Sequence, residues 1–348
     1  MNPYVLMVLL SSLGLGTTLT FASSHWLLAW MGLEINTLAI VPLMAQHHHP
    51  RAVEATTKYF LTQATAAAMI LFASTTNAWI TGEWDMNSMS SPIASTMVIT
   101  ALALKIGLAP MHFWMPEVLQ GLDLMTGLIL STWQKLAPLA LIIQTAQAID
   151  PLLLTALGLA STLVGGWGGL NQTQLRKIMA YSSIAHMGWM IIILQYAPYL
   201  TLLALLMYIF MTSAAFLTLK ISSATKVSTL AVAWSKSPIL TATTALVLLS
   251  LGGLPPLTGF MPKWLILQEL AKQNLPLTAT IMALAALLSL YFYLRLCYAM
   301  TLTISPNTTT ATTPWRVRTT QASLPLALFT TMTLGLLPVS PTVVMLVA

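Results

Sequence analysis

The sequence predicts an all-α polytopic membrane protein, and three observations carry that prediction. Of its 348 residues, 57% are hydrophobic and 6% are charged, whereas soluble domains carry roughly 25% charged residues. The apolar residues gather into eleven stretches, each close to the ~20 residues that a membrane-spanning helix needs. Two of those stretches carry glycine and proline in mid-span, which predicts two broken helices.

Polar or Pro/Gly-rich points separate the predicted spans and leave a single membrane domain over residues 1–348. The spans cover residues 3–22, 25–44, 55–80, 94–120, 124–146, 150–170, 175–195, 198–221, 238–270, 276–301 and 321–347. The first span lacks the basic n-region and cleavage site of a secretory signal, so we expect it to remain as a membrane helix. A Thr/Pro-rich polar loop is expected over residues 305–320.

Charges in the predicted loops set the expected orientation. If the N-terminus lies on one side, that side receives nine basic residues: Arg51, Lys58, Arg176, Lys177, Lys220, Lys226, Lys236, Arg316 and Arg318. The other side receives mainly acidic residues: Glu83, Asp85, Asp150 and the single Lys272. By the positive-inside rule the N-terminus faces the cytoplasmic or matrix side. Eleven spans then place the C-terminus on the opposite side.

Most charged residues fall in loops or near the ends of predicted spans, and four do not: Glu34, Lys105, Lys135 and Lys263. A charge at the bilayer centre costs about 2.5–3.5 kcal/mol on insertion scales, and such residues face the protein interior and mark ion pathways. A buried lysine exchanges its proton readily, whereas arginine stays charged. We therefore predict a proton relay through these residues, with Glu34 as the partner of Lys105.

Less specific interpretations stay open for three of these residues, Glu34, Lys105 and Lys263. Glu34 and Lys105 could form a structural ion pair between two helices. Lys263 follows Pro262 at the second break and could instead satisfy exposed carbonyls there. His112 and His186 are auxiliary candidates for the relay, or are held only in hydrogen bonds between helices. His112 lies seven residues after Lys105, which is the same face of an unbroken helix.

The two predicted breaks form a weak internal repeat. Gly107-Leu-Ala-Pro110 matches Gly253-Leu-Pro-Pro256 at an offset of 146 residues. By the span count the two copies run in opposite directions, as an inverted-topology repeat requires. We expect a first repeat over 94–221, with its broken helix at 94–120. A second repeat and C-terminal helix would cover 238–347, with its broken helix at 238–270.

The sequence gives little support to other classes of function. No basic cluster is interleaved with aromatic residues, so no nucleic-acid partner is expected. The single Cys297 forms neither an internal disulfide nor a zinc site. No phosphate-binding glycine loop and no nucleophile–base motif is present. We therefore expect no cofactor and no metal on this chain, and interpret the triplet from His47 to His49 as a solvated loop rather than a metal site.

Two runs resemble the antiporter-like membrane subunits of respiratory complex I. The first is Lys105-Ile-Gly-Leu-Ala-Pro-Met-His112-Phe-Trp-Met-Pro116, and the second is Lys177-Ile-Met-Ala-Tyr-Ser-Ser-Ile-Ala-His186-Met-Gly188. The resemblance covers the whole chain. It implies two inverted five-helix repeats, and eleven spans in animal members instead of fourteen. It also implies that the family's glutamate–lysine pair maps onto Glu34 and Lys105, its central lysine onto Lys135, and its distal charged residue onto Lys263.

The same resemblance implies a setting for the chain. NADH, FMN, iron–sulfur clusters and ubiquinone would be bound by other subunits of a proton-pumping complex in the mitochondrial inner membrane. Expected partners are the neighbouring antiporter-like chain 4, the small chain 4L, accessory subunits and lipids such as cardiolipin. Two alternatives remain: a stand-alone or Mrp-type cation/proton antiporter, and a purely structural membrane spacer.

Overall fold

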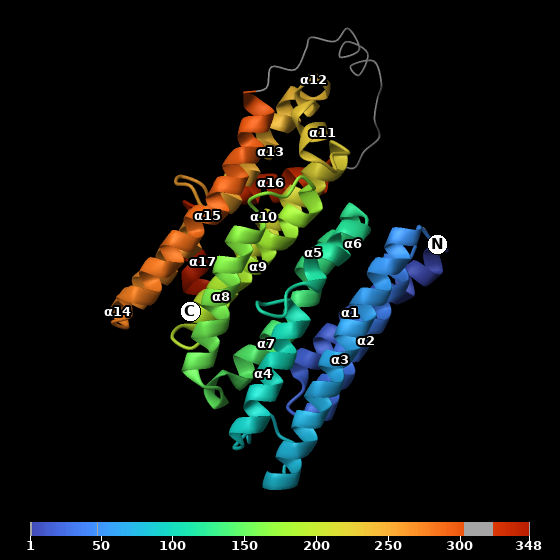
Figure 1. Cartoon of the computed structure of the whole chain (residues 1–348), viewed down its shortest axis with the longest axis vertical. Helices are drawn as coiled ribbons and strands as arrows, with labels where there is room; N and C mark the ends of the chain where they lie inside the picture. The colour runs from blue at the N-terminus through green and yellow to red at the C-terminus, as the bar shows by residue number, and fades with distance from the viewer. Residues whose placement is uncertain (1, 47, 303–322, 348) are drawn as a thin grey trace. The chain divides into compact units, whose positions relative to one another are not determined.

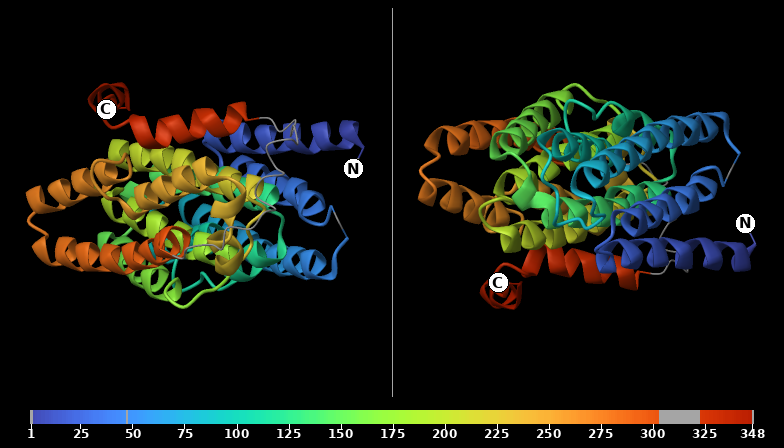
Figure 2. Two further views of the ribbon diagram at one scale, coloured as in Figure 1. Left: turned by 90° about the horizontal axis from the view of Figure 1, so that it is seen from above. Right: turned by 90° about the horizontal axis from the view of Figure 1, so that it is seen from below.

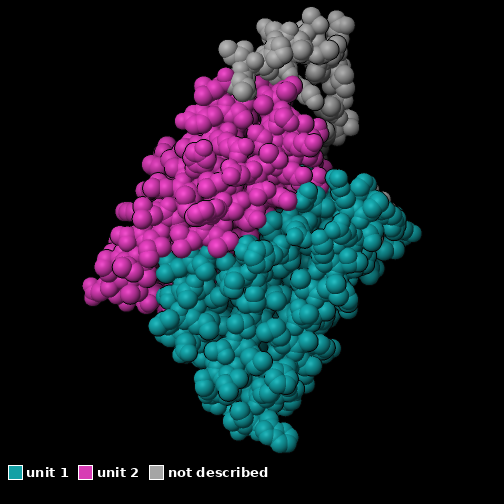
Figure 3. All heavy atoms as spheres, in the orientation of Figure 1, with its two compact units in different colours: residues 1–161 teal, residues 162–348 magenta. Residues whose placement is uncertain are grey.

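The computed structural model describes residues 2–46, 48–302 and 323–347. Within these ranges the regular structure is helical (Figure 1), with two isolated β-bridges besides. The chain divides into two compact units, residues 1–161 and residues 162–348 (Figure 3). The predicted polar loop at 305–320, with Arg316 and Arg318, lies outside the described residues, as does His47.

Unit 1 begins with three long helices and then contains the first break. Its elements are α1 (Pro3–Ala22), α2 (Trp26–Met44), α3 (Pro50–Thr81), α4 (Pro92–Ile106), α5 (Trp114–Gly121), α6 (Leu124–Thr132), the 3-10 turn η1 (Trp133–Lys135), α7 (Leu136–Thr145) and the 3-10 turn η2 (Ala146–Ala148). Helix α3 packs against α2, α4 and α5. The core of the unit therefore forms around α3 and α4, with fully buried side chains such as Ile70 and Leu102.

Helix α8 (Pro151–Gly168) contains the boundary between the units, and unit 2 contains the second break. Its further elements are α9 (Leu175–Ile193), α10 (Pro198–Ile221), α11 (Val227–Ala231), α12 (Ala233–Lys236), α13 (Pro238–Gly252), α14 (Phe260–Lys272), α15 (Pro276–Thr301), α16 (Leu324–Gly335) and α17 (Ser340–Val347). Helices α14 and α15 form an antiparallel hairpin, drawn in orange in both views of Figure 2. Helix α10 packs against α9, α13 and α16.

Proline fixes many of the helix starts. Helices α1, α3, α4, α10, α13 and α15 carry proline at one of their first two positions. There the missing N–H would have no partner in the helix anyway, and the fixed φ suits helix entry. Caps add to this signal, since Asn2 Oδ1 accepts a hydrogen bond of 3.2 Å from the Tyr4 N–H. The helix starts were therefore readable from the sequence to within a few residues.

Both predicted breaks are confirmed, and they share a backbone conformation. The residue that follows α4 is Gly107, with φ 84° and ψ 42°, and the residue that follows α13 is Gly253, with φ 81° and ψ 37°. This left-handed conformation is open to glycine and strained for other residues. The chain resumes as helix at Trp114 in the first case and at Phe260 in the second. The inverted relation of the two repeats stays a prediction.

Each of the eleven predicted spans is occupied by helix among the described residues. Six segments are long and apolar enough to cross a membrane by length and composition: Pro3–Ala22, Trp26–Met44, Leu124–Ala148, Pro151–Gly168, Pro198–Ile221 and Pro276–Thr301. The described part of the chain thus has the apolar helices of an integral membrane protein. The helices that do not reach this measure include the two halves that precede the breaks, Pro92–Ile106 and Pro238–Gly252.

The last predicted span differs from the structure. We expected one helix over residues 321–347, and the structure has two, α16 and α17. Pro338 falls between them and cannot continue the helix, because it lacks an N–H and its ring clashes with the preceding turn.

The Thr258 hydroxyl, in the second break, donates a hydrogen bond of 2.5 Å to the Thr333 carbonyl of α16. Helix α16 therefore braces the second break.

Helices α1 and α2 approach each other closely through two glycines. A Cβ placed on Gly16 would lie 2.4 Å from Asn36 Oδ1 and 2.8 Å from the Gly32 carbonyl oxygen. A Cβ on Gly32 would lie 2.8 Å from the Gly16 carbonyl oxygen. No real Cβ fits at such distances, so any side chain at either position separates the helices. Asn36 belongs to the site described below, and this contact therefore fixes part of its wall.

We predict that Gly16→Ala destabilises unit 1 by about 1–3 kcal/mol, the usual cost of overpacking. Thermal inactivation of the assembled protein and the amount of assembled chain measure the effect. Gly14→Ala is the matched control, because nothing lies within 4 Å of a Cβ on Gly14. Equal stability of the two variants would show that the α1–α2 approach is not tight.

Candidate functional site

Two buried lysines of unit 1 line one small cavity. Lys105, next to last in α4, is 5% exposed, and Lys135, last in η1, is 2% exposed. The cavity has a volume of about 10 Å³ accessible to the centre of a water molecule, which is room for about one water. Its polar wall comes from α2, α3 and η1: Asn36, Thr37, Tyr59, Gln63 and Gln134. Lys105 and Lys135 were predicted, and the five polar wall residues were not.

The first break places Lys105. Gly107 ends α4 two residues later, so Lys105 lies in the last turn, where the negative end of the helix dipole favours a cation. Trp114 and Met115 of α5 return to the cavity wall. The Trp114 Nε1–H donates a hydrogen bond of 2.9 Å to the Leu104 carbonyl. Because the indole occupies that freed carbonyl, the Lys105 ammonium is not needed to satisfy it.

A second irregularity places Lys135. The predicted span 124–146 is interrupted by the 3-10 turn η1, and such turns within a helix often mark functional positions. Pro138 explains the interruption, because it has no N–H to donate to the Gln134 carbonyl. Lys135 therefore lies at a local unwinding of the helix, on the wall of the same cavity as Lys105.

Glu34 lies on α2 beside this cluster and is half-buried. Its carboxylate accepts a hydrogen bond of 3.2 Å from the Thr37 hydroxyl, and it interacts electrostatically with Lys105 and Tyr59. Among the residues that the structure describes, no ion pair within 4.0 Å joins Glu34 to Lys105. The two groups therefore influence each other across a gap instead of forming a direct ion pair.

Lys263 lies in unit 2 at the second break. Its ammonium donates hydrogen bonds to the Gly252 carbonyl at 2.8 Å and to the Leu251 carbonyl at 3.5 Å. This is the carbonyl-satisfying arrangement that the sequence left open as an alternative. By the repeat offset, Leu251 and Gly252 correspond to Lys105 and Ile106, whereas Trp114 binds the Leu104 carbonyl in the first break. The two breaks are therefore closed by different chemistry at different carbonyls.

The two auxiliary histidines lie apart from the cavity wall. His112 is buried in the loop between α4 and α5, with Nδ1 3.3 Å from the Pro110 carbonyl oxygen. The same-face argument from Lys105 fails for His112, because α4 has already ended at Ile106. His186 lies on α9 of unit 2, with Nδ1 2.7 Å from the Ser182 carbonyl oxygen. The hydroxyls of Ser182 and Ser183 donate to carbonyls of their own helix.

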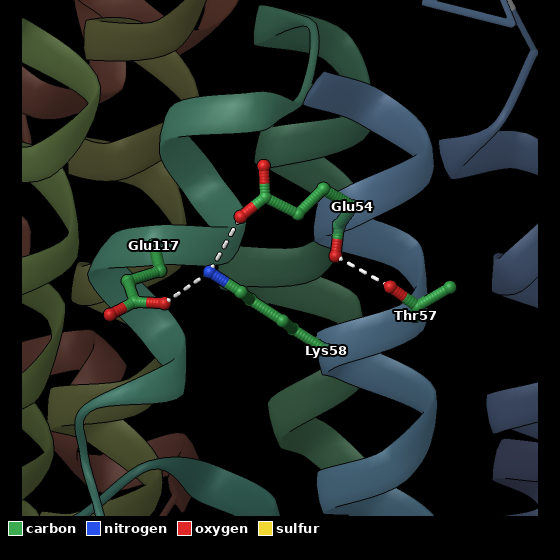
Figure 4. Close-up of polar contacts among 4 residues, drawn as sticks. All are labelled: Glu54, Thr57, Lys58 and Glu117. Atoms are coloured by element: carbon green, nitrogen blue, oxygen red, sulfur yellow. Dashed lines mark hydrogen bonds and ion pairs between the residues drawn. The ribbon is translucent and has the colours of Figure 1, made fainter. Parts of the chain in front are cut away.

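An exposed ion-pair cluster connects α3 to the helix after the first break (Figure 4). The Lys58 ammonium lies 2.8 Å from a carboxylate oxygen of Glu54 and 2.8 Å from one of Glu117. The hydrogen bond from Lys58 lowers the pKa of Glu54 below its usual value. Lys58 was predicted only as one of the basic residues on one side of the membrane, and its pairing with Glu117 was not predicted. Glu117 corresponds to Lys263 in the predicted repeat, so this position differs in charge between the two halves.

The described residues offer no group of three His, Cys, Asp or Glu side chains that could hold a metal ion. The ring of His49 instead caps α3, where Nδ1 accepts a hydrogen bond of 3.2 Å from the Arg51 N–H. The chemistry of the described site is therefore that of buried amines, amides, hydroxyls and one carboxylate.

Known proteins match both the sequence and the fold of the chain. Residues 23–289 match the family described as "NADH:quinone oxidoreductase/Mrp antiporter, TM", and residues 290–344 match "NADH dehydrogenase subunit 2 C-terminus". The chain is 86% identical over 346 residues to the NADH-ubiquinone oxidoreductase chain 2 of Carassius auratus, with 99% of each covered.

Solved structures agree with this assignment. A chain of respiratory complex I from Thermus thermophilus superposes with a TM-score of 0.87 at 28% identity, covering 100% of this chain and 81% of that one. A chain of the Mrp complex from a Dietzia species shares the fold, with a TM-score of 0.86 at 15% identity over 97% of this chain and 76% of the other. The chain belongs to the NADH:quinone oxidoreductase/Mrp antiporter family, and within it to the NADH-ubiquinone oxidoreductase chain 2 proteins.

Proposed function

We propose that the chain is a proton-translocating subunit in the membrane arm of NADH:ubiquinone oxidoreductase, respiratory complex I. The observation that carries the proposal is the pair of buried lysines, Lys105 and Lys135, on one polar cavity beside a helix break. The cavity has room for about one water, and a water between two amines can accept a proton from one and donate a proton to the other. The proton to be moved is the one that passes between the two lysines.

Each group has a definite part in the proposed relay. Lys105 holds a proton in the last turn of α4 and exchanges it with Lys135 through the cavity. Glu34 stabilises the charged form of Lys105 from α2, because opposite charges attract across the short distance. Lys263 is the fourth proton-carrying group, and its charge would be held by the Leu251 and Gly252 carbonyls. His112 and His186 remain auxiliary candidates.

The redox reaction would take place on other subunits. We propose that NADH, FMN, the iron–sulfur clusters and ubiquinone are bound elsewhere in the complex, and that quinone reduction changes the hydration and protonation of the lysines. The proposed partners are the membrane-arm subunits, especially antiporter-like chain 4 and chain 4L, with accessory subunits and lipids such as cardiolipin. The proposed location is the mitochondrial inner membrane, with the N-terminus on the matrix side and the C-terminus in the intermembrane space.

Two other functions make different predictions. A cation/proton antiporter of Mrp type would move protons in exchange for sodium without NADH oxidation. A structural spacer would tolerate neutral side chains at Glu34, Lys105, Lys135 and Lys263. The identity of 86% to a chain 2 protein over 99% of the chain favours the complex I assignment over the Mrp-type antiporter, and the buried lysine pair favours a relay over a spacer.

We predict that Lys105→Ala, in the assembled complex in sealed vesicles, lowers NADH-to-ubiquinone turnover and proton pumping together, by roughly 100-fold or more, because a positioned proton-transfer group is lost. Lys272→Ala, at an exposed lysine of α14, is the control and keeps wild-type rates. Survival of both turnover and proton yield in Lys105→Ala would refute the relay at its central residue.

A pair of variants separates the two interpretations of Lys263. Lys263→Gln keeps an N–H donor for the Gly252 carbonyl but carries no exchangeable charge, whereas Lys263→Met has neither. We predict that Lys263→Gln assembles with near wild-type thermal stability yet loses proton yield, and that Lys263→Met loses stability as well, because it leaves buried carbonyls unpaired. Normal pumping by Lys263→Gln would leave Lys263 only its carbonyl-satisfying role.

A further inference from the structure

A buried amide faces the lysine cavity without a hydrogen-bond partner. Gln63 lies on α3, is 3% exposed and contributes to the cavity wall. Among the residues that the structure describes, its Nε2 has no hydrogen-bond partner, and neither does Nζ of Lys105 on the same wall. Buried polar groups are nearly always hydrogen-bonded. Asn36 Oδ1, an acceptor on the same wall, is unpaired as well, so two donors and one acceptor together call for an acceptor that can also donate.

The chemistry of the cavity selects a water molecule as that acceptor. A lysine ammonium and an amide NH₂ only donate, so their common partner must offer at least two lone pairs. The volume of about 10 Å³ fits one water and nothing larger. The nearby carboxylate of Glu34 does not line the cavity, and its Oε2 accepts from Thr37 instead.

We propose that Gln63 is a positioning residue that holds one water molecule against the amine of Lys105. The proposal rests on the proposed function, in which Lys105 exchanges its proton. The water accepts from Gln63 and from the charged Lys105, and its own two hydrogens remain for other wall groups. As the water takes the proton of Lys105, it donates one of its own hydrogens to the neutral amine of Lys135 on the same wall, so the position of the water decides whether the transfer path is complete.

An amide suits this position because the charge of Lys105 changes. The ammonium only donates hydrogen bonds, whereas the neutral amine also accepts one. Water donates and accepts, and an amide offers both an NH₂ and a carbonyl oxygen. A hydrogen-bonded chain of amide, water and amine therefore survives in both protonation states, whereas a methionine of similar length would satisfy neither.

The fold fixes Gln63 relative to the break. Tyr59 lies one turn before it on α3 and packs edge-on against Trp114 of α5, with ring centroids 5.7 Å apart. One residue earlier, Lys58 pairs with Glu117 of α5, as Figure 4 shows. Two contacts thus hold α3 against the helix that follows the break, and the Trp114 indole reaches back to α4. These contacts hold α3, which carries Gln63, and α4, which carries Lys105, against the same helix, α5.

The first test is a map of the wild-type complex at a resolution that shows ordered water. We expect one water within hydrogen-bond distance of both Gln63 and Lys105. A cavity without water, or a direct contact of Lys105 Nζ with a carboxylate in that place, overturns the proposal whatever the variants do.

The second test uses Gln63→Met in the assembled complex. We expect turnover to fall by roughly 10- to 100-fold, the effect of a misplaced reacting group, with a larger solvent isotope effect because proton transfer becomes rate-limiting. Gln144→Met makes the same exchange at an exposed glutamine of unit 1 and leaves both quantities unchanged. Loss of rate without a change in the isotope effect would indicate a merely structural role and overturn the proposal.

The variants also separate this proposal from the one on which it rests. If Lys105→Ala abolishes pumping while Gln63→Met pumps normally, the relay stands and the role of Gln63 falls. If Lys105→Ala pumps normally, the proposed function itself fails.

Discussion

Each broken helix frees backbone hydrogen-bonding groups in an apolar chain, and the rest of the structure depends on how those groups are satisfied. Such breaks persist in membrane proteins only where protein or internal water provides partners. At the first break the Trp114 indole takes the Leu104 carbonyl. At the second, Lys263 takes the Leu251 and Gly252 carbonyls. Both breaks use the same glycine conformation, but their lysines differ. Lys105 lines a cavity, whereas the Lys263 ammonium is hydrogen-bonded to backbone carbonyls.

Because of this difference, the lysines at the two breaks have different surroundings. In unit 1 two lysines and several amides line space for about one water, and the half-buried carboxylate of Glu34 lies nearby. In unit 2 the cation donates hydrogen bonds to the Leu251 and Gly252 carbonyls. The lysines of the two halves therefore have different hydrogen-bonding surroundings, and the halves are not interchangeable.

Much of this architecture followed from the sequence. Composition predicted the class, prolines marked the helix starts, and Gly107 and Gly253 marked the breaks, because each is a local property of the chain. The cavity was not predictable in the same way. Gln63, Asn36 and Gln134 are ordinary polar residues in their own helices, and they became one wall only when three elements packed together. Pro138 was a local signal for the turn at Lys135 that the apolar pattern of that span concealed. The prediction of a single span over 321–347 was wrong, because Pro338 lies within an apolar run whose composition conceals the interruption.

The central claim is that Lys105 acts by exchanging a proton and not by supplying a fixed positive charge. Lys105→Arg tests it most directly, because arginine keeps the charge and does not release its proton. The measurement is protons moved per electron by the assembled complex in sealed vesicles, after its assembly has been verified. We predict that Lys105→Arg loses proton pumping. A normal proton yield from Lys105→Arg would contradict the account, since a permanent charge would then suffice.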